Sequence, residues 1–553
     1  MLRRSIAALV AVTTVLVACG DDDDDDGAEP VASEDTVAPG ASGPATGATD
    51  GTGGTEGTGG TDGTTSGSDP DEPSAPRRGG TLRYAEPYDP SRFDPHRSTI
   101  GQDIRLLAPV YDRLVHFDAD GALVPGLATE WSFDESGTVF TMQLREGVVF
   151  HDGAPFDSAA VKANIERGQT VEGSSITSDL AEITSVETPD PYTVVFHLSE
   201  PNSMLPGLLS HRAGAMVSPT AFENPDLDRA PVGAGPYRVV QYDPGNQIIM
   251  ERFAEHWNTE AGGPDRIEYR IMLDARTRLN ALLAGEVDMT VLSGNEREEA
   301  ERAGFATEGE PALTYLVLYL NRARSEFGDP LVRRALNHAI DRQAIIDAVL
   351  LGAGVPAVQP FPEGYFAHHP DYPADYYPYD PDRARELLAE AGLADGFEFE
   401  MLVPANDLSN RLAEVVMAML GEVGITVRAT PVEVAQTADV YYAQEVGDSL
   451  IAQWGGRPDP QMTLELQFSA DGFGNPGDHT TPEFEEANLR TRAATDPDER
   501  QRLLQEQVAI VVEEAFQVPL VHDYGIYAYS DKVTTFETLA TGQADYLSIT
   551  LAE

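Results

Sequence analysis

The loop Gln453–Pro460 carries the side chains whose chemistry points most directly to ligand binding. It follows an apolar strand segment at residues 450–451 and is rich in Gly and Pro, a composition typical of a cleft wall. The guanidinium of Arg457 could clamp a carboxylate through two hydrogen bonds, or it could pair with a neighbouring acid of this acid-rich chain. Trp454 could stack on a ligand or pack inside the fold. We predict Trp454, Arg457 and Asp459 as ligand contacts, although Asp459 also belongs to an Asp-Pro pair.

A further candidate, Tyr88, lies in the loop that follows the predicted first strand, Thr81–Ala85. Open α/β sheets bind their ligands at the carboxyl ends of their strands. We therefore predict that Tyr88 contacts the ligand from this first part of the chain.

The sequence lacks the motifs of hydrolytic enzymes. It contains no G-x-S-x-G, no H-E-x-x-H and no cysteine besides Cys19, so neither a nucleophile–base pair nor a zinc triad is indicated. The pair His368-His369 has no further Cys or His at ligand spacing, which predicts an exposed loop rather than a metal site. We interpret His151, in a turn with Gly153 at positive φ, and His338, in an amphipathic helix, as structural. We expect no catalytic residue, metal or cofactor; a secreted peptidase is the rival interpretation.

The N-terminus predicts export. Arg3 and Arg4 precede an apolar stretch, Ile6–Val17, which is too short to span a bilayer but suits a signal peptide over residues 1–18. The tetrad Leu16-Val17-Ala18-Cys19 resembles the lipobox of bacterial lipoproteins, in which the cysteine is lipidated. The alternatives are an ordinary secretory signal and a twin-arginine route. We expect Cys19 to be lipidated and the protein to be extracytoplasmic, anchored to the cell membrane.

Residues 19–78 have the composition of a tether. An acidic run, Asp21–Asp26, precedes a segment of Gly, Thr, Ser, Ala, Pro and acids with almost no large apolar side chain, which predicts a disordered spacer. The whole chain has 92 acidic and 37 basic residues, a net charge of −55. A negative field of this size argues against nucleic-acid binding.

The remaining residues, 79–553, are too many for one hydrophobic core and predict two or three domains. Their patterns alternate between short strands and helices, which favours α/β lobes. We predict these strands: Thr81–Ala85, Val139–Leu144, Tyr192–Leu198, Tyr237–Tyr242, Gln247–Arg252, Ile267–Met272, Tyr315–Leu320, Phe397–Val403 and Ile425–Thr430. We predict these helices: Asp274–Ala284, Pro330–Ile340, one from Asp341 to Gly352, Asp382–Ala391, Asn410–Glu422 and Asp496–Glu514. Asp243-Pro244-Gly245-Asn246 predicts a hairpin turn.

Several segments, in order along residues 79–553, resemble bacterial extracellular solute-binding proteins of family 5, the oligopeptide/dipeptide/nickel-binding group. They are Gly79–Tyr84, Phe93-Asp94-Pro95, Val110–Val115, Leu123–Trp131, Leu144–Phe156, Val232–Tyr237, Arg278–Asp288 and Arg334–Arg342. Segments matching in order over the whole region are more specific than any single motif.

The resemblance implies an α/β fold of two lobes around a hinge, the Venus-flytrap arrangement of periplasmic binding proteins of class II, with a subdomain inserted in lobe I. The implied boundaries are 79–117, 217–310 and 520–553 for lobe I, 118–216 for the subdomain and 311–519 for lobe II. It implies a monomer that closes over its ligand and delivers it to an ABC permease and ATPase.

The resemblance makes a peptide the first expectation for the ligand, with an opine, a glutathione-like compound, a metal chelate or an oligosaccharide as alternatives. Peptide-binding relatives carry an acid for the ligand's amino terminus near the position of Arg457. This departure indicates a ligand carboxylate instead. Tyr315, at the implied entry to lobe II, and Phe361, in the aromatic loop 359–379, are further candidate contacts; the alternative for that loop is a cover over hydrophobic surface.

Overall fold

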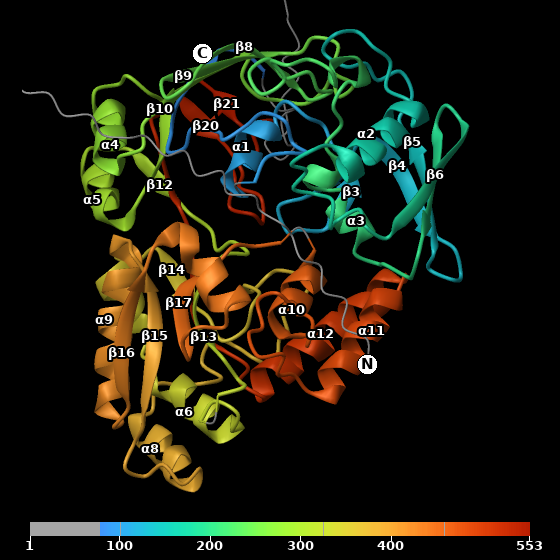
Figure 1. Ribbon diagram of the computed structural model, residues 1–553. Coiled ribbons are helices and arrows are strands. Elements are labelled where there is room, and N and C mark those ends of the chain that lie inside the picture. The colour runs from blue at the N-terminus through green and yellow to red at the C-terminus, as the bar shows by residue number, and fades with distance from the viewer. Residues whose placement is uncertain (1–77, 100, 325, 458, 553) are drawn as a thin grey trace, which may run out of the picture. The chain divides into compact units, whose positions relative to one another are not determined.

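The computed structural model describes residues 78–99, 101–324, 326–457 and 459–552. The predicted signal peptide, Cys19 and all of the tether except Arg78 lie outside these residues. Among the described residues, the strands form five sheets: one of seven strands, one of six, one of four and two of two (Figure 1).

The seven-stranded sheet contains strands from the start, middle and end of the described chain. Its central strand β1 pairs in parallel with β10 and β11, and the other pairs are antiparallel. We call this sheet and the residues packed on it lobe I. In spatial order the strands are β12 (Ala306–Glu308), β19 (Ile526–Tyr529), β11 (Met289–Leu292), β1 (Thr81–Glu86), β10 (Arg266–Ile271), β9 (Gln247–Arg252) and β8 (Tyr237–Asp243).

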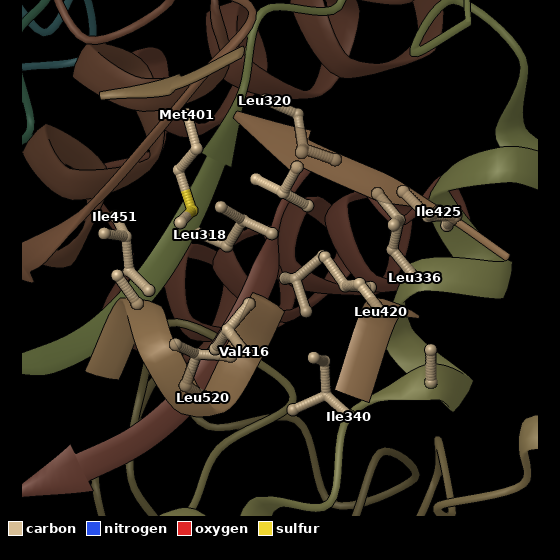
Figure 2. Close-up of a cluster of buried hydrophobic side chains, with 14 of the residues drawn as sticks. Leu318, Leu320, Leu336, Ile340, Met401, Val416, Leu420, Ile425, Ile451 and Leu520 are labelled. Atoms are coloured by element: carbon tan, nitrogen blue, oxygen red, sulfur yellow. The ribbon is translucent and has the colours of Figure 1, made fainter. Parts of the chain in front are cut away.

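The six-stranded sheet, with the helices that pack on it, forms what we call lobe II. Its strand β13 is buried at every position because it lies between two other strands and is covered on both faces. Figure 2 shows part of the core on one face, where Leu318 of β13, Leu336 of α6 and Leu420 of α9 meet. In spatial order the strands are β14 (Gly354–Pro356), β18 (Val518–Asp523), β13 (Tyr315–Leu320), β17 (Ser449–Trp454), β15 (Glu398–Pro404) and β16 (Thr426–Val432).

A four-stranded antiparallel sheet and helix α2 form the inserted subdomain. In β7 every second residue is buried, the pattern of a sheet with one face on a core. That core is separate and contains Phe140, Ile165 and Phe196. The strands, in order, are β4 (Ala128–Phe133), β5 (Val139–Leu144), β7 (Thr193–Leu198) and β6 (Ile183–Asp190). The two-stranded sheets are β2 (Val115–Phe117) with β3 (Leu123–Pro125), and β20 (Val533–Thr535) with β21 (Thr550–Leu551).

The recurring Asp-Pro pairs begin helices. Asp329, Asp380 and Asp496 each accept a hydrogen bond from a backbone amide of the first turn, and each is followed by Pro. Proline suits this position because its missing N–H would have no partner inside the helix. The α-helices are α1 (Ile104–Leu107), α2 (Ser158–Thr170), α3 (Leu205–Leu208), α4 (Ala275–Leu283), α5 (Gly294–Arg302), α6 (Pro330–Ala339), α7 (Arg342–Ile345), α8 (Pro381–Glu390), α9 (Asp407–Glu422), α10 (Pro460–Phe468), α11 (Pro482–Ala493) and α12 (Pro497–Glu513).

Most predicted elements are present within a few residues of their expected bounds. The hairpin of β8 and β9 is confirmed, and Gly245 in its turn has a φ of 74°. Gly153 likewise has a positive φ, 82°. The predicted helix after Asp341 is α-helical only over α7 and continues as a π-helix, Ile346–Leu350.

The chain passes between the two large sheets at two places. The first lies between β12 and β13. The second follows Asp523, the last residue of β18, which pairs there with β14.

The lobe II core provides a stability test. Leu318 has 0% exposure in the centre of β13, so Leu318→Ala leaves a cavity and should cost about 2–5 kcal/mol of unfolding free energy. Leu489→Ala is the matched control, because Leu489 of α11 is 67% exposed. Urea denaturation followed by circular dichroism checks this; equal midpoints for the two variants would contradict the described core.

Candidate ligand-binding site

A cavity of about 930 Å³ lies where lobe I, lobe II and the inserted subdomain meet. This volume is in the range of small-molecule sites. Lobe I contributes residues around 87–88 and 102–105, the subdomain contributes 175–182 and 202–212, and lobe II contributes 453–457 and 462–466. Residues 312–314 and 523–525, where the chain passes between the lobes, also line it. A ligand in this cavity is therefore in reach of all three parts.

The cavity is richer in cations than the chain as a whole. Its wall contains six arginines and four acids, whereas the sequence has a net charge of −55. These residues are Arg105, Arg212, Arg278, Arg411, Arg457 and Arg492, with Asp179, Glu182, Glu465 and Asp523. Charges that line a concave surface focus their field into it, so the cavity favours an anionic ligand more than the outer surface does.

Arg457 is placed in the cavity wall by the loop that ends β17. A Cβ atom at position 456 would lie only 2.6 Å from the Leu313 Cβ. Glycine is therefore required here for the loop to pack against the segment that passes between the lobes. The guanidinium carbon of Arg457 lies 4.8 Å from the centroid of the Trp454 ring, a cation–π contact. Burial lowers the pKa of Arg457. No residue that the structure describes forms an ion pair or hydrogen bond with its guanidinium.

Trp454 and Asp459, the neighbours of Arg457 in the predicted site, are largely buried and do not line the cavity. The Trp454 Nε1 donates to the Thr463 hydroxyl at 3.3 Å, and its ring supports Arg457. Asp459 accepts from the Gln461 amide at the start of α10 and pairs with Arg500 at 2.6 Å. Burial raises the pKa of Asp459, and the charge of Arg500 lowers it part of the way. Both residues thus position the loop rather than the ligand.

Tyr315 and Phe361 are also placed away from the cavity wall. The Tyr315 hydroxyl is buried and hydrogen-bonded to Gln467 and Gln517. Phe361 lies in a buried cluster where the aromatic loop packs on α10 and α12. The geometry fits the alternative for this loop, a cover over hydrophobic surface. Neither side chain is retained in the site that we propose below.

Tyr88 does line the cavity, beyond the carboxyl end of β1, and its side chain is 41% exposed. The guanidinium carbon of Arg105 lies 5.9 Å from its ring centroid. Of the six candidates from the sequence, the structure therefore brings Tyr88 and Arg457 into the cavity wall.

The structure adds charged wall residues that sequence reasoning missed. Arg105 comes from α1, Asp179 from the inserted subdomain and Arg492 from α11. Burial raises the pKa of Asp179, and the charges of Arg457 and Arg212 lower it part of the way. None of these residues belongs to a short motif or lies near the others in sequence, so no pattern in the chain signals them.

Arg492 joins lobe II to the inserted subdomain. Its guanidinium pairs with Glu465 of α10 at 2.8 Å and, across the boundary, with Glu182 and Glu200 of the subdomain, the latter at 3.4 Å. The backbone amide of Ser203 donates to the Arg492 carbonyl at 2.9 Å, and the Ser203 hydroxyl donates to the Thr491 carbonyl. This set of contacts, the Arg492 network, holds one side of the cavity together.

The histidine pair of the aromatic loop is bound within its own loop. The His368 Nδ1 lies 3.0 Å from the carbonyl oxygen of Phe361, and the His369 amide donates to Gln359. Across the residues described, no cluster of three or more His, Cys, Asp or Glu side chains is arranged to hold a metal ion. No helix among them is long and apolar enough to cross a membrane.

Comparison with known proteins places this architecture in a family. The family model "Bacterial extracellular solute-binding proteins, family 5 Middle" matches residues 122–475. The glutathione-binding protein GsiB of Salmonella paratyphi A is 29% identical over 479 residues, which cover 83% of this chain and 90% of GsiB.

Two solved structures extend the comparison to the fold. HbpA2 of Haemophilus parasuis matches with a TM-score of 0.77 and 25% identity, over 86% of this chain and 100% of HbpA2. The periplasmic binding protein DppA of Helicobacter pylori, in complex with the peptide STSA, matches with a TM-score of 0.70 and 25% identity, over 86% of this chain and 99% of DppA. The resemblance found in the sequence is confirmed: the chain has the two-lobed fold of periplasmic binding proteins and belongs to the bacterial extracellular solute-binding proteins of family 5.

Proposed function

We propose that this solute-binding protein captures a peptide or peptide-like compound with a free carboxylate and delivers it to an ABC permease and ATPase. The observation that carries the proposal is the guanidinium of Arg457, which faces the cavity without a protein partner among the described residues. A cation that is partly removed from water and left unpaired is costly. A ligand carboxylate offsets that cost through charge-assisted hydrogen bonds.

The relatives support a peptide as the source of that carboxylate. GsiB is named for glutathione, itself a peptide, and DppA was solved with the peptide STSA. Peptides also carry an ammonium group, for which Asp179 is the suitable acid in the cavity wall. The alternative, a non-peptide acid without an amino group, satisfies Arg457 equally well but leaves Asp179 without a cation.

The proposal includes closure of the lobes over the ligand. A ligand shifts an open–closed equilibrium by its difference in affinity for the two states. Arg457 belongs to lobe II and Tyr88 to lobe I, so a ligand that contacts both favours the closed state. The Arg492 network adds protein–protein contacts to this same state.

The remaining parts of the proposal concern the cell envelope. Cys19 lies outside the described residues, and its lipidation stays a prediction from the sequence motif. A lipid on Cys19 and the acidic tether after it would keep the receptor, as a monomer, on the outer side of the membrane near its permease.

Replacing Arg457 by Gln should weaken peptide binding while leaving the fold intact. Loss of a charge-assisted hydrogen bond costs about 1.5–3 kcal/mol, which corresponds to a Kd that is higher by about 10- to 100-fold. Arg428→Gln is the matched control, since Arg428 pairs with Glu398 on the exposed surface of lobe II. A thermal-shift screen with small peptides, including glutathione, identifies the ligand, and isothermal titration then gives each Kd. Equal affinities of the natural protein and Arg457→Gln would remove Arg457 from the site.

Replacing Arg492 by Gln should weaken closure. The change leaves Glu182 and Glu465, both largely buried, without their cation, and we expect a loss of about 1–2 kcal/mol, or about 5- to 30-fold in ligand affinity. Arg490 lies on the same helix as Arg492, and Arg490→Gln removes only an exposed pair with Glu506 of α12, so it should change affinity by less than about twofold. Small-angle scattering should show a smaller ligand-induced compaction for Arg492→Gln. If both variants bind and compact like the natural protein, the network has no part in closure.

A further inference from the structure

Arg105 is a second cation in the cavity wall whose charge the protein does not pair. It lies in α1, whose neighbouring residues Ile104 and Leu106 are anchored in the core of lobe I. Its guanidinium lies against the Tyr88 ring, with 5.9 Å between the guanidinium carbon and the ring centroid. Within the described part of the chain, no side chain or backbone group forms an ion pair or a hydrogen bond with it.

Glu86 is the buried acid whose charge acts on Arg105, and it forms no ion pair with it. Glu86 is 1% exposed, and neither of its carboxylate oxygens accepts a well-formed hydrogen bond from the described residues. Burial raises the pKa of Glu86 to about 7, while the charges of Arg105 and Arg278 lower it part of the way. Glu86 therefore acts on Arg105 through its charge but makes no ion pair or hydrogen bond with it.

Arg278, the other arginine beside Glu86, already has hydrogen-bond partners within the protein. It donates to the backbone carbonyls of Val291 at 2.9 Å and of Met272 and Leu273 at 2.8 Å. Two of its nitrogens, Nε and Nη1, are therefore used in holding α4 to the sheet, whereas Arg105 makes no such hydrogen bond.

We propose that Arg105, supported by the Tyr88 ring, is a second anion subsite, so that the ligand is an amino acid or peptide derivative with two carboxylates. This inference rests on the proposed function, in which Arg457 holds the first carboxylate. Arg105 belongs to lobe I and Arg457 to lobe II, so the two carboxylates of one ligand are held by different lobes. Both anion–guanidinium contacts then form together only in the closed state, which gives the ligand its preference for that state.

The cavity wall also contains an acid that could pair with the ammonium group of such a ligand. Asp179 lines the same cavity, and its only hydrogen bond to a described residue is a 3.5 Å contact with the Ser178 hydroxyl. Arg105, Arg457 and Asp179 together match a compound with two carboxylates and one ammonium, such as an acidic dipeptide or glutathione.

The test compares two dipeptides that differ only in the second anionic group, Ala-Glu and Ala-Gln, by isothermal titration at constant ionic strength. We expect the natural protein to bind Ala-Glu at least about tenfold more tightly than Ala-Gln. Arg105→Gln should reduce this preference to less than about twofold by weakening Ala-Glu alone, and Arg105→Lys should retain part of it. Arg270→Gln, which alters an exposed pair between β10 of lobe I and Glu286, should leave both affinities unchanged.

The outcomes separate this inference from the proposed function. Equal binding of the two dipeptides by the natural protein, or an equal loss of both in Arg105→Gln, overturns the second subsite but leaves the peptide receptor intact. If neither dipeptide nor glutathione binds the natural protein, the peptide receptor itself is overturned, and the subsite with it. Circular dichroism spectra of the variants ensure that a loss of binding reflects the site and not unfolding.

Discussion

The site depends on one constraint, the way in which the chain passes twice between the lobes. The two passages pack tightly against each other: a Cβ on Gly309 would lie 2.6 Å from the Tyr524 ring and 3.0 Å from the Gly525 carbonyl oxygen. Glycine at position 309 lets the two segments meet. Because the cavity wall includes residues next to both passages, any change of angle between the lobes alters the cavity. Binding and closure are thereby linked in the same few residues.

The charges of the cavity oppose those of the chain. The strongly acidic chain repels other anions, yet the wall of the cavity contains Arg105 and Arg457. Both guanidinium groups rest on an aromatic ring, Tyr88 and Trp454 respectively. An aromatic ring supports a guanidinium without using the guanidinium's N–H donors. These donors stay available for hydrogen bonds to a ligand. The protein thus holds the cations in place and leaves their pairing to the ligand.

The sequence predicted the strands and helices well because each is determined mainly by residues that are close together in the chain. Strands such as β5, β9 and β13 have the expected bounds, and the Asp-Pro pairs begin helices as capping chemistry requires. The site was predicted only in part, because a candidate's spacing does not reveal which way its side chain points. Tyr315 lies on a strand buried on both faces, where its hydroxyl is used by two glutamines. Arg105 and Asp179 reach the cavity wall only through tertiary folding, and no local pattern distinguishes them.

The most direct measurement of the central claim is titration of the purified protein with glutathione and acidic dipeptides, followed by mass spectrometry of the recovered ligand. The account predicts saturable binding of one ligand per chain, a smaller radius of gyration in the complex, and recovery of the ligand with its mass unchanged. Hydrolysis of the ligand, or the absence of saturable binding by every peptide acid tested, would contradict it.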